Sequence, residues 1–514
     1  MRIHNRIFAF FKEKPKNECF AKSRQLFFVL FAFVAIQSLN YGKVQAQEMF
    51  GMVNSNFAGT SGLYINPSSM QNSRYWLDIN ILTLDVFADN NYAYLPREDF
   101  KLLDLLKKDF SLPTYGAYET PTLNKSGWGD RSFYISERLN LPSFMFVNYE
   151  QAYALQIAYR TAGSGRSVGN DITNFGFYGL NYKPQHNIEY NDNYSGFAAL
   201  SWAEIGLSYS RQLKYERFTI IHGGVTLKRL LGMGGGYLNV DNLRYVVLND
   251  STVDIRNLTF EAAYSAPVDY ATNEYQGDPL FKGSGFALDL GVTIIKTEKE
   301  LRRFAHGDDF CEQEFQPYLY RLGISLLDVG WIKFRNNAQK HRLENVSYFW
   351  ENLNFDNYNT LVDIMEDVST RFTGASDGSL IDTTFSVGLP TALSAQFDYH
   401  YRGNWYFNTT AITGIPIFGN ASVVRPTQIS FTPRWESPYF EASLPISLYN
   451  LRYPRIGLAL RFYNFTIGSD KLGSVLGFND FYGTDIYFSL KINFRKGNCR
   501  KSRETLPCGS MDFK

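Results

Sequence analysis

The stretch Gly374-Ala375-Ser376-Asp377-Gly378 has the Gly-x-Ser-x-Gly spacing that can place a nucleophilic serine on a sharp turn between a strand and a helix. The order is reversed here, because a helical pattern precedes the serine and an alternating strand pattern follows it. A serine nucleophile also needs a base and an orienting group, and no local partner pattern accompanies the histidines. We therefore predict that Ser376 lies in a loop turn, that the chain has no catalytic residues and that it is not an enzyme.

A glycine-rich stretch and two pairs of oxygen-bearing residues are also weak evidence for a binding site. Residues 232–237, "GMGGGY", lack the Lys-Ser/Thr pair of a phosphate-binding loop and open no helical pattern. Asp308-Asp309 and Asn191-Asp192 carry the oxygens that Ca²⁺ prefers, but such pairs are also typical of solvated loops. The sequence predicts neither a metal site nor a cofactor.

A different set of charges recurs at alternate positions of apolar stretches. In residues 485–494, "DIYFSLKINF", Asp485 and Lys491 alternate with bulky apolar residues that end at Phe494. The same period of two recurs in 151–160, 286–296, 320–326, 393–402, 440–448 and 456–462, which predicts strands with one apolar and one polar face. Along these strands, the opposite face is small or singly charged, and its charged members include Asp289, Arg321, Asp398, Arg402, Arg461, Asp485 and Lys491.

Two kinds of fold are compatible with this alternation. A secreted sandwich would turn the apolar face to its core, whereas a transmembrane barrel turns it to lipid and the polar face to the lumen. Small residues and isolated charges suit a curved, crowded interior, so we predict an all-β fold, a transmembrane antiparallel β-barrel of about 14 strands. The seven charges would then face the lumen, and Phe494 would be the lipid-side aromatic of the closing strand. Irregular stretches at about 89–130, 162–194, 230–282 and 335–378 would be mainly external loops, with a helical patch at 359–372.

Composition agrees with this class. The 514 residues include 43 Phe, 35 Tyr and 7 Trp, and membrane barrels carry aromatic girdles at both interfaces. A mean hydropathy of −0.25 excludes a bundle of apolar membrane helices. The net charge of +1 gives no reason to expect nucleic acid.

The N-terminus resembles a secretory signal peptide. Basic residues precede an apolar run from Leu26 to Ile36. Val44-Gln45-Ala46 resembles a cleavage site, and we expect cleavage after Ala46 or Gln47. An uncleaved anchor is the alternative, because the basic region is long. Export to an outer membrane follows from the signal together with the barrel.

Three cysteines remain after the signal: Cys311, Cys499 and Cys508. Three thiols do not make a disulfide scaffold, although Cys499 and Cys508 could pair in an oxidising compartment. Whether they pair stays open on the sequence alone.

A resemblance to a known family enters with "GTSGLYINPSSM", residues 59–70, which is similar to the Asn-Pro-Ala-type N-terminal motif of the FadL superfamily of outer-membrane proteins. The motif here is Asn66-Pro67-Ser68. Residues 431–448, 455–477 and 483–494 resemble the C-terminal half of an uncharacterised Bacteroidota family of outer-membrane barrels, and PorV-type barrels of secretion systems are similar more distantly. The FadL resemblance implies a 14-stranded barrel with an N-terminal plug and, in the transporters, passage of hydrophobic ligands through a lateral opening.

The domain prediction is a signal peptide at 1–46, a plug segment at 47–73, a barrel at 74–494 and a basic periplasmic tail at 495–514. Our first functional hypothesis is a channel or carrier for small hydrophobic molecules. The alternative is a structural or accessory barrel whose tail docks a periplasmic or secretion-system partner. Further expected partners are outer-membrane lipid, lipopolysaccharide and the barrel-assembly machinery.

Overall fold

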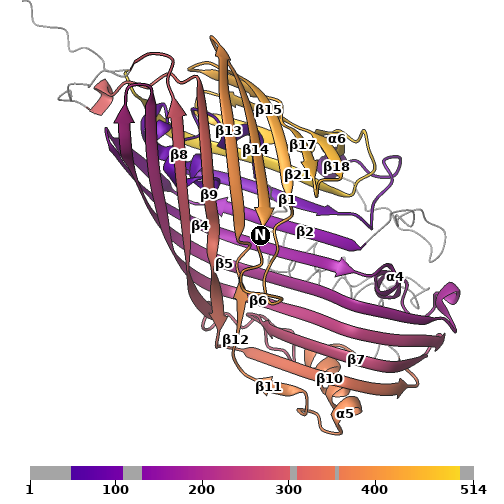
Figure 1. Cartoon of the computed structure of the whole chain (residues 1–514). Coiled ribbons are helices and arrows are strands. Elements are labelled where there is room, and N and C mark those ends of the chain that lie inside the picture. Colours follow the sequence, from indigo (N-terminus) through magenta and orange to yellow (C-terminus); the bar gives the residue numbers. More distant parts are fainter. Residues whose placement is uncertain (1–47, 108–129, 301–309, 354–357, 498–514) are drawn as a thin grey trace, which may run out of the picture.

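A computed structural model describes residues 48–107, 130–300, 310–353 and 358–497. Its strands form one antiparallel sheet that closes on itself, because β1 (Tyr75–Asn90) pairs with β2 (Arg131–Asn140) on one side and with β21 (Gly483–Arg495) on the other (Figure 1). This closure confirms the predicted transmembrane-type antiparallel β-barrel. The predicted signal peptide and most of the tail lie outside the described residues.

Several positions in the ring are filled by successive short strands rather than one long strand. The segments that share a position are β2 with β3, β7 with β8, β9 with β10, β11 with β12 and β13, β16 with β17, and β18 with β19. Counted in this way, the ring has 14 strand positions, as predicted.

The remaining strands have the following bounds: β3 (Ser143–Asn148), β4 (Gln151–Val168), β5 (Glu189–Glu216), β6 (Thr219–Asn249), β7 (Thr252–Ser265), β8 (Gly283–Lys296), β9 (Tyr320–Phe334), β10 (Ala338–Trp350), β11 (Leu380–Asp382), β12 (Phe385–Gly388), β13 (Ala392–Arg402), β14 (Trp405–Gly414), β15 (Gln428–Glu436), β16 (Phe440–Ser443), β17 (Ile446–Tyr449), β18 (Tyr453–Ile456), β19 (Leu458–Phe462) and β20 (Phe465–Ser469). The helices are α3 (Phe50–Val53), η2 (Gly59–Tyr64), η3 (Pro67–Asn72), η4 (Leu102–Leu106), α4 (Asn170–Tyr178), η5 (Lys183–Gln185), η6 (Phe310–Glu312), α5 (Leu361–Thr373) and α6 (Leu472–Val475).

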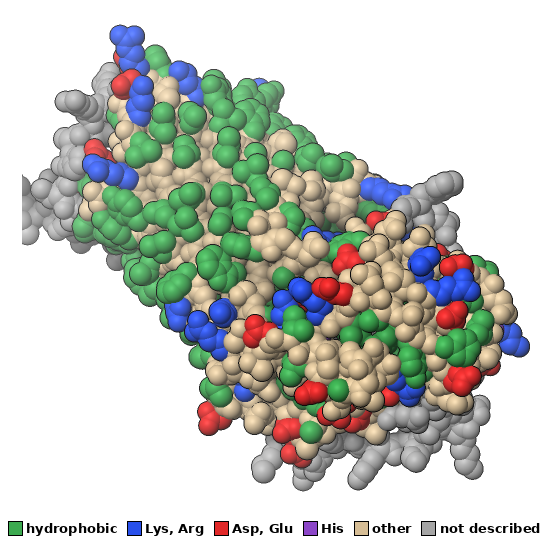
Figure 2. All heavy atoms as spheres, turned by 60° about the horizontal axis from the view of Figure 1, so that its bottom comes forward, with side chains coloured by type: hydrophobic (Ala, Val, Ile, Leu, Met, Phe, Trp, Pro, Cys, Tyr) green, Lys and Arg blue, Asp and Glu red, His purple; other side chains and the backbone are tan. Residues whose placement is uncertain are grey.

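The residues of β21 face the outside and the inside of the ring in turn. Leu490, Ile492 and Phe494 are exposed on the outside, whereas Ser489 and Lys491, which alternate with them, are buried on the inside. Hydrophobic side chains cover a broad band of the surface, and Lys, Arg, Asp and Glu gather beyond it (Figure 2). The large apolar residues therefore line the outside of the ring, where a water-soluble sandwich would have turned them inward.

One part of the wall continues beyond this band. β5 and β6, with 28 and 31 residues, extend past the other strands and pair onward with β7 and β10 (Figure 1). The expectation that 230–282 and 335–378 are mainly external loops is therefore wrong for the residues in β6, β7 and β10. The physical reason is that both faces of this extension carry polar residues, so the apolar alternation that marks the lipid-facing strands is missing.

The predicted helical patch at 359–372 is α5. It begins at a capping box in which the Thr360 hydroxyl accepts from the Asp363 amide at 3.1 Å. Val368 and Phe372 of α5 pack against Tyr348 and Trp350 of β10, in a cluster that also includes Phe175 of α4. α5 thus covers the extension and does not plug the barrel.

The two ends of the ring differ. At one end, which we call the hairpin end, β1 begins and β21 finishes. Short turns connect neighbouring strands there, among them the predicted turns at Gly403-Asn404 and around 437–439. The opposite end carries the extension and the longer connections other than the one between β8 and β9. Within the described ranges, no helix has the length and apolar character needed to cross a membrane.

Candidate functional site in the barrel interior

The interior contains the segment that precedes the first strand. Residues 48–73, which we call the plug segment, form α3, η2 and η3, and nearly all of their side chains are buried. Their partners lie on strands all around the ring, so the segment crosses the inside of the barrel. Glycine, serine and asparagine are frequent in it, and their short side chains allow tight turns and local hydrogen bonds in place of a strand.

The predicted motif Asn66-Pro67-Ser68 is the polar centre of the plug. The Asn66 side chain accepts a hydrogen bond from the Ser68 amide at 3.0 Å and so caps η3, where Pro67 is the first residue. The same side chain donates to Gln396 Oε1 on β13 at 3.0 Å. The hydroxyl oxygens of Ser68 and of Thr293 on β8 are 2.6 Å apart. One short motif therefore begins η3 and binds two strands of the wall.

Three glycines on adjacent strands make room for this motif. A Cβ atom at Gly224 of β6 would lie 2.5 Å from the Pro67 carbonyl carbon, and one at Gly291 of β8 would lie 2.1 Å from Asn66 Oδ1. At Gly323 of β9 it would lie 2.9 Å from Asn66 Nδ2. These distances are too short for any side chain, so the wall is shaped for the plug. The signal available in the sequence is a glycine at an interior-facing position of a strand.

Below this contact, toward the hairpin end, two of the predicted lumen charges form an ion pair. Arg321 Nη2 lies 2.8 Å from Asp398 Oδ2, and it also donates to the Asn54 carbonyl of the plug at 2.7 Å. Arg434 of β15, which the sequence did not single out, completes the group at 3.0 Å from Asp398 and 3.0 Å from Glu436. Its side chain is 0 % exposed, so these charges are satisfied by one another and not by water.

A second group of charges centres on Asp328 of β9, another residue that sequence reasoning missed. Its carboxylate accepts from Arg160 at 2.9 Å, from Lys228 at 2.7 Å and from Arg425 at 3.0 Å. Asp289, a predicted lumen residue, lies 2.6 Å from the same Lys228. Asp328 has φ 55° at an irregularity of the strand, and no local pattern in the sequence indicates that it turns inward.

This group connects strands β4, β6 and β9 with the connection before β15. Glu48 at the start of the described chain joins it through Arg425 at 3.0 Å. Charges from distant parts of the sequence thus meet across the barrel, and the described interior is crossed by ion pairs instead of a row of free charges.

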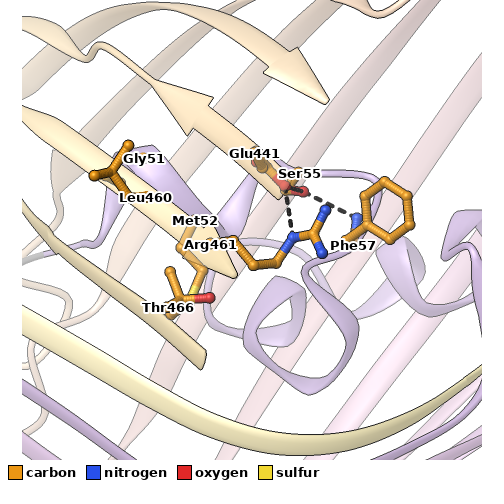
Figure 3. A pocket seen from close by; sticks show the side chains of 9 residues that line it. Gly51, Met52, Ser55, Phe57, Glu441, Leu460, Arg461 and Thr466 are labelled. Carbon is orange, nitrogen blue, oxygen red and sulfur yellow. Dashed lines mark hydrogen bonds and ion pairs between the residues drawn. The ribbon is translucent and has the colours of Figure 1, made fainter. Parts of the chain in front are cut away.

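Arg461 lines a pocket between the plug and the wall (Figure 3). Its Nε is 3.1 Å from Glu441 Oε2, which also accepts from Ser55 of the plug at 2.7 Å. Met52 and Phe57 of the plug complete the lining. The empty space here is about 210 Å³ even with the part open to solvent included, which is below the usual size of a ligand pocket, so the plug nearly fills it.

The last two interior charges also contact the plug or its neighbours. Lys491 donates to the Ala58 carbonyl and lies 3.6 Å from Asp78. Asp485 accepts from the Asp470 amide at 2.6 Å, and Asp470 in turn accepts from the Phe50 amide of α3 at 2.8 Å. Six of the seven singled-out charges therefore lie inside the ring next to the plug or to its ion pairs.

Arg402 is the exception and corrects the prediction of a lumen-facing residue. It is exposed, its guanidinium lies over the Tyr401 ring at 5.3 Å, and the strand register shifts just before it. The alternation is lost because the chain already turns toward Gly403. Phe494 is 44 % exposed on the outside and packs on Trp76 at 5.8 Å between ring centroids.

Apolar side chains of the plug occupy the remaining space. Phe50 and Val53 pack with Ala392, Ala459 and other small or flat wall residues. A second cluster joins Phe57, Leu63 and Met70 to alanines of β4. Small wall residues thus leave an apolar space that the plug fills.

At the hairpin end, the first residues past β21 also contact the plug. Lys496 Nζ donates to the Gln71 carbonyl of η3 at 3.1 Å, and burial lowers the pKa of this amine to about 8. The start of the predicted tail therefore packs against the plug, and only residues 498–514 lie outside the described chain.

Among the described residues, no group of three or more His, Cys, Asp or Glu side chains is placed to hold a metal ion. Ser376 is exposed in the turn after α5, with a helix before it and a strand after it, as its sequence context predicted.

Comparison with known proteins adds the family. The fold is similar to the "TodX deltaS2S3 mutant monoaromatic hydrocarbon channel" (TM-score 0.37, 8% identity, 88% of this chain and 96% of that chain). It is also similar to the "CymD monoaromatic hydrocarbon channel" (TM-score 0.29, 9% identity, 87% and 98%) and to the Pseudomonas putida toluene transporter TodX (TM-score 0.29, 8% identity, 88% and 100%). Identities and TM-scores this low do not carry the activity of those proteins over to this chain. No curated protein matches it. A family model described as "Family of unknown function (DUF5723)" matches residues 67–470, from the plug motif to the end of β20, and the chain therefore belongs to this family.

Proposed function

We propose that the protein is an integral outer-membrane barrel that carries small hydrophobic molecules and that the plug segment is its gate. The apolar outer band supports insertion into lipid, because every backbone group of a closed ring pairs with a neighbouring strand. The hairpin end, where the ring begins and ends, would face the periplasm, and the extension would face outward. Lipid, lipopolysaccharide and the barrel-assembly machinery are the partners that this location implies.

The observation that carries the proposal is the apolar space that the plug fills. Phe50, Met52 and Val53 rest against Ala392 and Ala459, so withdrawal of the plug would expose a space lined by small apolar side chains. A hydrophobic molecule of moderate size would replace the contacts that the plug gives up. Polar contacts such as those of Asn66 would hold the closed state until the plug moves.

An interruption of the wall supports a lateral route. β2 and β3 share one ring position but are separated by Leu141-Pro142, and Pro142 has no backbone donor. A side chain replaces part of the backbone hydrogen bonding between strands there, because Asn80 Nδ2 donates to the Leu141 carbonyl at 3.2 Å. Tyr64 of the plug lies against Asn140 on the inner side. A molecule released by plug movement could leave toward lipid at this interruption.

A reversible lock on the plug tests the proposal. The hydroxyl oxygens of Ser68 and Thr293 are 2.6 Å apart, so S68C with T293C should form a disulfide that fixes the plug to β8. The matched control joins Thr413 to Thr427, whose hydroxyls are 2.8 Å apart and which lie outside the plug, by the same double substitution.

We expect the locked plug variant to lose uptake of labelled toluene by whole cells and to regain it after reduction, while the control pair is unaffected by reduction. Toluene is chosen because one of the similar solved structures is that of a toluene transporter. Uptake that is equal in the locked and reduced forms, or absent from the parent protein, would contradict the gate.

A second function is favoured by the packed interior itself. Ion pairs from β4, β6 and β9 meet at Asp328, as expected of a barrel that serves as a scaffold and not as a path. In that case the basic tail would dock a periplasmic or secretion-system partner. Deletion of 500–514, which spares Cys499 as well as Lys496 and its plug contact, should then remove co-purification of that partner while leaving insertion unchanged.

A further inference from the structure

The connection between β8 and β9 reaches across the hairpin end. These two strands lie about half-way around the ring from the seam where β1 pairs with β21. Residues 310–319 of the connection nevertheless contact the seam. We call η6 and the residue after it, Phe310–Gln313, the clasp.

Aromatic and polar contacts hold the clasp at the seam. The Phe310 ring lies 6.3 Å from that of Trp76 on β1 and 5.0 Å from that of Phe146 on β3, between centroids. Gln313 donates to the Val147 carbonyl at 2.9 Å and accepts from the Tyr149 amide at 2.9 Å. Both side chains thus bind strands beside the point where the ring closes.

The clasp also touches the end of the closing strand. The Gly497 amide, two residues past β21, donates to the Cys311 carbonyl at 2.7 Å. Cys311 is itself disulfide-bonded. The other cysteines of the chain are Cys19, Cys499 and Cys508, and all three lie outside the described residues.

We propose that Cys499 is the partner, so that the clasp is bonded covalently to the end of the closing strand. Cys499 is two residues from Gly497, a stretch of chain that spans at most about 7 Å. Disulfides join residues whose Cα atoms are about 4.4 to 6.8 Å apart, which this reach matches. Cys508 is nine residues farther along and would have to close a longer loop at a higher entropic cost. Cys19 lies in the segment that resembles a signal peptide.

The bond has a definite chemistry. The thiols of Cys311 and Cys499 lose two protons and two electrons together, and a disulfide-exchange oxidant of the exported compartment is reduced to its dithiol. The bond joins a connection from the far side of the ring to the strand that completes it. It also lies next to Lys496, which donates to the plug at Gln71. The clasp would thus hold both the seam and the hairpin-end mouth of the barrel.

This inference rests on the proposed export to an outer membrane, and the test separates the two. The full-length protein is extracted from the outer-membrane fraction without reductant, its free thiols are alkylated, and tryptic peptides are mapped by mass spectrometry. The sequence gives each cysteine its own peptide: 304–321 for Cys311, 497–500 for Cys499 and 504–514 for Cys508. A protein that is missing from the outer-membrane fraction refutes the proposed location, and its disulfide is then mapped after oxidative refolding.

We expect a linked pair of 304–321 with 497–500 and an alkylated Cys508. C499S should free the Cys311 thiol for labelling, whereas the matched variant C508S should leave it protected. We further expect C499S, and not C508S, to unfold at a lower temperature in a heat-modifiability gel. A pair that contains 504–514, or a Cys311 that is alkylated in the parent protein, overturns the proposal.

Discussion

Substitution of Gly291 by alanine should release the plug while leaving the barrel closed. The added Cβ would lie 2.1 Å from Asn66 Oδ1 and 2.8 Å from Pro67 Cδ, so the motif must move by about an ångström. That movement breaks or weakens the hydrogen bonds of Asn66 to Gln396 and Thr293 and its cap on η3. At roughly 1 kcal/mol for each of these contacts, the docked plug should lose about 2 to 4 kcal/mol. The undocked population then rises about 30-fold to 700-fold.

Hydrogen exchange measured by mass spectrometry on residues 48–73 reads this population directly. We expect amides of the plug segment to exchange faster in G291A by a factor in that range, with the strands of the ring still protected. The matched control is G206A, because a Cβ at Gly206 meets its nearest atom, on Thr226, at an ordinary 3.5 Å. Plug exchange in G291A that equals the parent and G206A would refute the reasoning that the glycines shape the wall for the plug.

The remaining predictions concern charge, lipid and pH. D328N removes the carboxylate that three buried cations share, and it should lower the free energy of unfolding in urea by about 3 to 5 kcal/mol; a change below 1 kcal/mol would contradict the ion-pair account. F494D places a charge on the outer face of the closing strand and should reduce the folded fraction recovered from membranes, whereas N493D, one position away, should not; equal recovery would count against the lipid-facing assignment. Burial lowers the pKa of Lys496 to about 8 from about 10.5, so the unfolded chain binds more protons between these values and stability should rise as the pH increases from 8 to 10.5. K496M should flatten that rise, and an unchanged slope in melting experiments would show that another group causes it.

The alternating pattern is enough to predict the class of fold, and the number of alternating stretches indicates roughly a dozen to sixteen strands, a range that contains the 14 observed positions. It works where one face of a strand meets a uniform apolar surface, as at Leu490, Ile492 and Phe494. It fails in the extension, where β7 and β10 have polar residues on both sides and read as loops. It also fails at Arg402, because a strand pattern does not show where the chain begins to turn.

The site was harder to predict than the fold. Asn66-Pro67-Ser68 was visible as a motif, but its partners Thr293 and Gln396 lie more than two hundred residues away. Asp328 turns inward only because its strand is locally irregular, and no spacing rule gives that. The sequence leaves the pairing of Cys499 with Cys508 open, and nothing in it indicates that Cys311 is disulfide-bonded, because that depends on where the β8–β9 connection crosses.

The central claim is that lipid contacts the large side chains of the ring while the plug and ion pairs fill its inside. Spin labels at successive residues of β9, placed in reconstituted membranes, test it most directly. Ile324 is 62 % exposed and its neighbour Ser325 is buried against the plug, where its hydroxyl donates to the Ile65 carbonyl. The account predicts that a label at Ile324 collides with oxygen dissolved in lipid and not with a water-soluble nickel complex, and that a label at Ser325 collides with neither. A label at Ile324 that meets the nickel complex, or one at Ser325 that meets oxygen as freely as its neighbour, would contradict it.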